Sequence, residues 1–435
     1  MIEFLLSIPA YIKVGVSFAG ILLLNRLSMS LGLAIILCSL ALSLWSGTGI
    51  QGIVFQAKGF GRPENYLLPV VIFLLLFFTE SLNKTGRMER TITTLKSWLK
   101  SKKMLLAGLP ALVGLLPMPG GAIFSAPLVA SLDSPGELDA RQRVAINYWF
   151  RHIWEYWWPL YPGVILAVRY SELPAATFFL IQIPFTFAAL LGGYVFILKK
   201  TKRGNLGNSE NGKIEFAAVF SALGPIGILV IVSVLGSAVL PKIGFTGTLS
   251  SLLSMLIGLI IAIALVFSGN SSAWKASLGM LKQTGTWQMI LLVISILAFS
   301  ATIKAPLDAA GTTLVTLMRD EFINTGIPLA AVIMLIPFIS GMATGVAFGF
   351  VGASFPIVFA LVGQNPSLGV TAATTACAYA FGYMGMMLSP IHVCFVVTCE
   401  YFKTPLFDNY RYLIGPVVTI LIIALILSGL YYTLM

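Results

Sequence analysis

The chain alternates long apolar segments with short polar ones. Ten of the apolar segments match the length of about 20 residues that a membrane-crossing helix needs. We expect these crossings at residues 5–25, 28–46, 66–82, 144–168, 174–198, 216–240, 247–267, 288–303, 370–400 and 410–433. Two further apolar segments, 104–131 and 328–362, carry glycine and proline near their middle and predict re-entrant hairpins that enter and leave the membrane on the same side.

The second half of the chain repeats the pattern of the first. The matching segments are Leu109–Gly114 with Ile336–Gly341, Gly120–Val129 with Gly349–Val358, and the Trp158-Pro159 break with Ser389-Pro390. Because each half then crosses the membrane five times, an odd number, the halves must have opposite orientations. The sequence therefore predicts an all-α polytopic membrane protein with an inverted-topology repeat and about ten crossings.

The predicted division of the chain follows from this repeat. Residues 1–198 form the first repeat, with hairpin 104–131 and a broken helix at 144–168. A polar, basic linker, 199–215, joins it on the cytoplasmic side to the second repeat, 216–435. The second repeat holds hairpin 328–362 and a broken helix at 370–400. A basic segment with apolar residues at helical spacing, 86–103, predicts a helix in the membrane interface.

Composition and charge support a membrane protein. Hydrophobic residues make up 58% of the chain and charged residues 10%, which is far too apolar for a soluble domain. A net charge of +11 raises nucleic acid as a partner, but the basic residues follow membrane topology instead: 19 of the 27 fall in the predicted cytoplasmic loops and 7 in the outer ones. Both termini are then extracytoplasmic, and the lipid bilayer is the surrounding partner. The four cysteines show neither a disulfide framework nor metal-ligand spacing, so we expect no metal site and no bound cofactor.

The hairpin turns are candidate binding elements for an anion. A turn inside the membrane exposes backbone N–H groups and a helix N-terminus, which together attract negative charge without a charged side chain. Gly120, Gly121 and Gly349 would form these turns, with tips reading Pro-Gly-Gly and Phe-Gly-Phe, and Ser125 and Ser354 would add hydroxyls. Two alternatives stay open: the glycines of the second segment suit close helix packing, and a membrane serine often bonds only its own helix.

The broken helices hold the few charges inside the predicted spans. Arg151, His152 and Glu155 fall on one helical face, and a charge at this depth marks a functional site. We expect Arg151 to attract an anion and Glu155 or His152 to exchange the coupling proton, with Asn147 nearby. The alternative is that Arg151 and Glu155 merely neutralise each other. The second break adds Ser389 and His392 to the expected substrate site.

Pro119-Gly120-Gly121-Ala122, the segment 147–162 and Ser389-Pro390-Ile391-His392-Val393-Cys394 resemble a prokaryotic membrane-protein family of unknown function, domain of unknown function 401. That family looks like a branch of the ion transporter superfamily, whose members carry dicarboxylates, citrate, gluconate or arsenite. The resemblance covers nearly the whole chain and implies a homodimer, elevator-like movement and the cytoplasmic (inner) membrane. One departure is that the Ser-Asn-Thr hairpin signature of the sodium-coupled branch is absent.

These observations favour a secondary transporter of a small anion, such as an organic carboxylate, coupled to H⁺ or Na⁺. A cation/proton antiporter is the alternative, although it would need a negative cavity. A channel or an intramembrane enzyme is the third. No Gly-x-Ser-x-Gly or His-Glu-x-x-His motif is present, so we expect no enzyme activity.

Overall fold

The computed structural model describes residues 8–86, 101–116, 121–133, 137–199, 201, 216–245, 247–268, 272–363 and 365–435. Within these ranges the regular structure is helical, apart from one isolated bridge between Pro306 and Thr313. Most of the predicted interfacial helix at 86–103 and of the linker at 199–215 lies outside the described residues, as does Gly120.

The first repeat begins with long helices and ends with interrupted ones. Its helices are α2 (Ala10–Arg26), α3 (Leu31–Trp45), α4 (Gly49–Phe60), α5 (Pro63–Lys84), α7 (Lys102–Val113), α8 (Ala122–Leu132), α9 (Ala140–Arg151), α10 (Pro162–Ser171) and α11 (Ala175–Gly193). A π-helical turn, Tyr194–Leu198, extends α11. The second repeat has α12 (Phe216–Val239), α13 (Gly247–Phe267), α14 (Ser272–Ser277), α15 (Thr284–Ile303), α16 (Leu314–Thr325), α17 (Leu329–Thr344), α18 (Ala347–Val362), α19 (Leu368–Met387), α20 (Val393–Tyr401) and α21 (Tyr410–Leu434).

The long helices identify an integral membrane protein. Among the described residues, six helices have the length and apolarity to cross a bilayer alone, or seven if α16 and α17, bent by 119°, count as one span. The predicted crossings at 66–82, 174–198, 216–240, 247–267, 288–303 and 410–433 fall on these six helices. The short helices α4 and α16 were not predicted, because each is too short for the periodicity of a membrane span.

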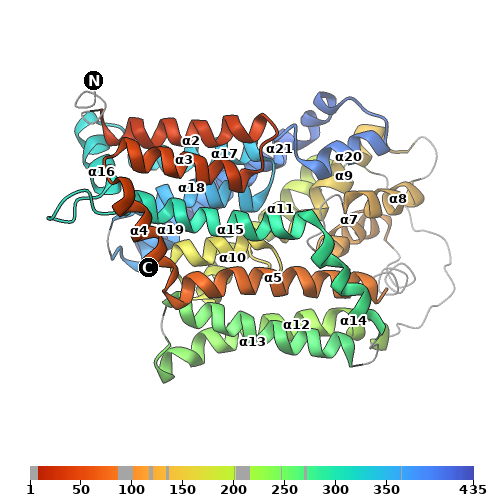
Figure 1. Cartoon of the computed structure of the whole chain (residues 1–435). Helices are drawn as coiled ribbons and strands as arrows, with labels where there is room; N and C mark the ends of the chain where they lie inside the picture. Colours follow the sequence, from red (N-terminus) through yellow and green to blue (C-terminus); the bar gives the residue numbers. More distant parts are fainter. Residues whose placement is uncertain are drawn as a thin grey trace.

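Helices of the first repeat pack against helices of the second. In Figure 1, α3 runs beside α15, and α13 beside α5, and both pairs are in contact. The short helices also contact the other repeat: α4 contacts α15, and α14 contacts α5. These contacts join helices of the two halves of the chain. The C-terminal end of the chain lies toward the left of Figure 1.

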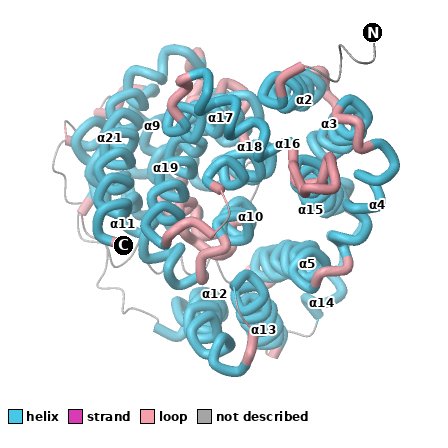
Figure 2. The backbone as a smooth tube through the Cα atoms, turned by 90° about the vertical axis from the view of Figure 1, so that its left-hand side faces the viewer, coloured by secondary structure: helices cyan, strands magenta, loops and turns pink. Residues whose placement is uncertain are grey.

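Each of the two predicted hairpin segments contains two helices that are in contact with each other. Helix α7 packs on α8, and α17 on α18. Figure 2, which looks along the helices, shows α18 and α10 side by side, with α2, α3 and α15 on one flank and α19, α11 and α21 on the other. Residues 328–362 therefore form a helix–turn–helix hairpin, and the described parts of 104–131 form two helices in contact rather than one continuous helix.

The second hairpin turns earlier than predicted. Helix α17 ends at Thr344 and α18 begins at Ala347, so Gly345 and Val346 form the tip. Gly345 has φ +64°, in the left-handed region that glycine adopts without strain, whereas Gly349 lies in the first turn of α18. The expected tip Phe348-Gly349-Phe350 is therefore wrong by about one helical turn, since only the backbone shows which glycine reverses the chain.

Candidate functional site

Two helix breaks create the site. Helix α9 ends at Arg151 and α10 begins at Pro162, while α19 ends at Met387 and α20 begins after His392. Pro162, at the first helical position of α10, has no N–H group that needs a partner, which favours the start of a new helix there. Between the helices the backbone leaves α-helical geometry inside the buried core, where protein groups must satisfy its polar atoms.

Each break is joined to its own hairpin by an equivalent hydrogen bond. The Tyr161 hydroxyl donates to the carbonyl oxygen of Gly114, and His392 Nδ1 donates to that of Gly345; in both cases the partners are 47 residues apart. Ser389 Oγ adds a bond of 2.7 Å to the carbonyl oxygen of Met342. Tyr161 and His392 therefore have matching roles in the two repeats.

Two tryptophans fasten the first hairpin to its break. Trp154 Nε1 donates to the carbonyl oxygen of Ala111 at 2.8 Å, and Trp158 Nε1 donates to that of Leu115 at 3.0 Å. Both carbonyls belong to the end of α7 and the turn that follows it. These side chains thus satisfy the exposed carbonyls of an interrupted helix.

The two breaks meet through buried side chains. His152 Nε2 lies 3.2 Å from His392 Nε2. The Tyr383 hydroxyl donates to the carbonyl oxygen of His152 at 2.6 Å, and the Tyr379 hydroxyl to that of Glu155 at 2.6 Å. These two tyrosines belong to α19 of the second repeat, and their hydrogen bonds hold the backbone of the first break in place. The sequence reasoning missed them, because a tyrosine inside an apolar span gives no signal of its partner.

Arg151 lies at the tip of the first hairpin. Its side chain is 3% exposed, and its guanidinium packs so closely on Gly121 that an added Cβ there would overlap it. Glu155 and Cys394 are within electrostatic reach of this charge. The Glu155 carboxylate lies 3.8 Å from His152 Nε2. The predicted cluster of Arg151, His152 and Glu155 is therefore present, together with His392 from the other repeat.

Asn147 links the first hairpin to the second repeat. Its Nδ2 donates to the carbonyl oxygen of Ala122 and to Thr398 Oγ1, both at 3.1 Å. Its Oδ1 is buried and has no hydrogen-bond partner within the described parts of the chain. A buried acceptor without a partner is costly, so this oxygen is suited to a polar ligand.

The two predicted serines bond locally. Ser125 Oγ donates to the carbonyl oxygen of Ala122, and Ser354 Oγ to that of Phe350, each within its own hairpin helix. This is the alternative that the sequence left open for them. The space beside His152, which Trp149, Tyr156 and Tyr383 help to line, has no room for a water molecule. The site is thus closed in this conformation.

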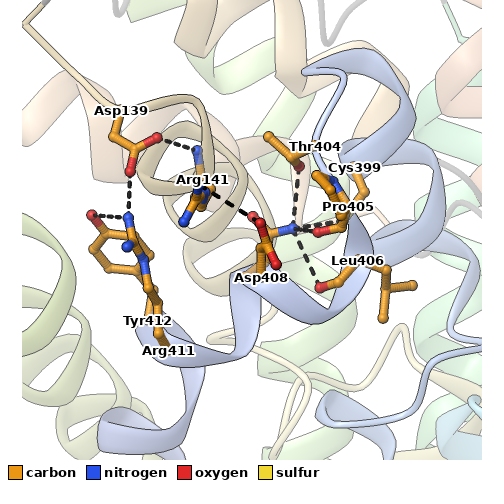
Figure 3. Close-up of polar contacts among 10 residues, drawn as sticks. Asp139, Arg141, Cys399, Thr404, Pro405, Leu406, Asp408, Arg411 and Tyr412 are labelled. Atoms are coloured by element: carbon orange, nitrogen blue, oxygen red, sulfur yellow. Dashed lines mark hydrogen bonds and ion pairs between the residues drawn. The ribbon is translucent and has the colours of Figure 1, made fainter.

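A polar network at one end of the protein links the start of α9 to the segment that follows α20. Asp139, the N-cap of α9, accepts hydrogen bonds from the backbone of Arg141 and from the Arg411 side chain of α21 (Figure 3). Arg141 also lies 3.7 Å from Asp408. Asn409 Nδ2 donates to Thr404 Oγ1, Cys399 Sγ and two backbone carbonyls, which closes the loop after α20.

Basic side chains line two adjoining cavities outside the breaks. The first has a volume of about 370 Å³ and the second about 1090 Å³, and both are lined by Tyr170, Glu172 and Lys304. The basic residues that line them are Lys58, Arg62, Arg169, Lys304 and Arg319. Glu172 is the one acidic residue among these lining positions. The sequence placed these five basic residues in three different outer loops, and the fold brings them together.

A family model described as "Protein of unknown function (DUF401)" matches residues 14–433. The chain belongs to this family. None of the curated proteins compared with it is significantly similar. Among solved structures, the crystal structure of the Alcanivorax borkumensis YdaH transporter, whose topology is described as unusual, has a similar fold, with a TM-score of 0.61. The alignment covers 88% of this chain and 89% of that one at 13% identity. The DUF401 chain thus shares with that protein a membrane fold.

Proposed function

We propose that this protein is a secondary active transporter of a small anion, of the organic carboxylate class, coupled to a proton or sodium gradient. The observation that carries the proposal is the position of Arg151: a buried guanidinium at the tip of a hairpin, where the two repeats cross. A charge at this depth is costly, so a buried guanidinium marks a functional site. We expect the anionic substrate to bind at this charge during transport.

The start of α8 adds to the positive potential at Arg151. Gly121 is the N-cap of α8 and offers no side chain to cap the helix. The guanidinium therefore lies against a helix N-terminus, which itself carries a partial positive charge. Together the guanidinium and the helix N-terminus form a region of positive potential that suits a carboxylate. The orphan Oδ1 of Asn147, on the neighbouring α9, would accept a hydrogen bond from a substrate hydroxyl.

The basic cavities favour an anion over a cation as the cargo. Lys58, Arg62 and Arg169 line the first cavity, and Arg319 lines the second. A cleft with one sign of charge concentrates ions of the opposite sign and speeds their arrival. A cation/proton antiporter would need the reverse potential. The family resemblance adds a homodimer and an elevator-like movement to this proposal. We also propose that His152 or Glu155 exchanges the coupling proton.

A ligand screen followed by transport tests the proposal. Purified protein is heated with succinate, citrate, gluconate, arsenite or sulfate, with Na⁺ or K⁺ as the counterion. A ligand of the folded state raises the melting temperature, by an amount set by its concentration relative to Kd. The proposal predicts a shift with at least one carboxylate, and counterflow of that labelled anion in proteoliposomes. Sodium-driven alkalinisation without any anion would support the antiporter instead.

A further inference from the structure

Three metal-binding side chains converge where the broken helices meet. They are His152 of the first break, His392 at the N-cap of α20 and Cys394 in its first turn. Their ligand atoms lie within 4.8 Å of one another, and all three residues are buried. We propose that His152 Nε2, His392 Nε2 and Cys394 Sγ bind one divalent transition-metal ion of the Zn²⁺ class.

The hydrogen bonds of the two histidines fix their tautomers. His152 Nδ1 lies 2.5 Å from the carbonyl oxygen of Tyr148, and His392 Nδ1 lies 2.5 Å from that of Gly345. A carbonyl oxygen only accepts hydrogen bonds, so each Nδ1 carries a proton. In the neutral rings each Nε2 then holds a lone pair. Metal-bound histidines have this arrangement, in which the second nitrogen donates to a carbonyl or a carboxylate.

The spacing of the two Nε2 atoms suits one shared ion. They face each other at 3.2 Å, where two lone pairs repel unless an electrophile lies next to both. In a tetrahedral zinc site, Zn–N bonds of 2.0–2.1 Å place two nitrogen ligands about 3.3 Å apart. The observed distance therefore needs almost no rearrangement of the rings.

The third donor selects the class of metal. A thiolate with two imidazoles is a soft, nitrogen-rich set that suits Zn²⁺ rather than Mg²⁺ or Ca²⁺. The Glu155 carboxylate, 3.8 Å from His152 Nε2, is a neighbour that balances charge. Thiolate and carboxylate together offset the two positive charges of the ion, which a buried site requires.

The ion would join the two repeats. His152 and His392 are 240 residues apart, and the ligands come from both broken helices. The spacing of histidine and cysteine along the chain therefore gives no hint of the site. Because the ion binds the folded arrangement and not the unfolded chain, it raises the stability of the crossing point.

Metal analysis of the full-length protein tests this inference without a transport assay. Chelator-treated protein is titrated with Zn²⁺ and with Co²⁺, whose thiolate charge-transfer absorption reports sulfur ligation. We expect one ion per chain and a higher melting temperature with metal. Cys394→Ser should remove the charge-transfer band and weaken binding by more than about 100-fold, since loss of an outer-shell partner alone costs about 10–100-fold.

A matched control is Cys399→Ser, which changes another buried cysteine of α20 that bonds Asn409 instead. It should keep both the stoichiometry and the band, and His392→Gln should weaken binding in the same way as Cys394→Ser. The inference is overturned if wild-type protein takes up no stoichiometric metal, in which case a proton bridges the two rings. It is also overturned if Cys394→Ser binds Co²⁺ with an unchanged spectrum.

Discussion

The guanidinium of Arg151 and the backbone of Gly121 are in direct contact, although 30 residues of chain separate them. This contact ties a buried charge to the tip of a re-entrant hairpin. It makes Gly121 a sensitive position, because any side chain there displaces the end of Arg151. The glycine is therefore expected to control the site rather than the fold.

Gly121→Ala should affect anion binding, whereas Gly114→Ala should affect the stability of the fold. At Gly121 the added methyl meets the end of a side chain, which can move, so the protein should fold with little change in melting temperature but lose anion affinity. At Gly114 the methyl would overlap the backbone carbonyl of Arg151, so the fold itself should be destabilised. Thermal unfolding and ligand-induced shifts of both variants check this. Equal loss of stability in the two would contradict the assignment.

Tyr161→Phe should lower stability without changing volume. The buried carbonyl of Gly114 would lose its hydroxyl partner, at a cost of about 1–3 kcal/mol. Tyr432→Phe, at an exposed position of α21, is the control and should change stability little. Denaturation in detergent with both variants measures the difference. An unaltered unfolding midpoint for Tyr161→Phe would show that the bond does not hold the hairpin.

Asn147→Asp should destabilise the crossing of the repeats. The amide donates to a carbonyl and a hydroxyl, and a carboxylate in its place would face the carbonyl of Ala122 with an acceptor. We expect a loss of at least about 1–3 kcal/mol. Asn324→Asp in α16, where the side chain is exposed, should have almost no effect. Similar melting temperatures for the two variants would remove Asn147 from this role.

The basic cavities predict a pH limit on anion uptake. Desolvation by the surrounding protein lowers the pKa of Lys304, although part of its side chain is exposed; Glu172 raises this pKa, and Arg169 and Arg62 lower it further. A lowered pKa means that Lys304 loses its charge at a lower pH than an ordinary lysine does, so uptake should begin to fall on the alkaline side. Lys304→Arg should extend uptake to higher pH, since arginine stays charged. Initial rates at low salt measure this, and identical pH profiles would contradict it.

The hydropathy pattern predicted most of the architecture correctly. Prolines and glycines at matching places located both hairpins and both breaks, because they interrupt helices wherever they occur in lipid. The pattern did not show that Gly345, rather than Gly349, reverses the second hairpin. Both are glycines in an apolar run, and the difference lies in a backbone angle that packing decides.

Only some residues of the candidate site could be predicted from the sequence. Arg151, His152 and Glu155 stand out because charges are rare inside spans. Their partners do not, since Tyr379 and Tyr383 are unremarkable in an apolar helix until the fold brings them to the opposite break. Contacts between distant segments carry no local signal, and the site is made largely of such contacts.

Uptake by Arg151 variants is the most direct test of the proposed transport mechanism. Counterflow of labelled succinate or citrate, whichever raises the melting temperature more, is measured for wild type, Arg151→Lys and Arg151→Gln in proteoliposomes. Loss of a charged hydrogen bond should weaken anion affinity by about 10–100-fold in Arg151→Gln, while Arg151→Lys retains part of it. Arg151→Gln protein that inserts normally and transports with unaltered affinity would contradict the account.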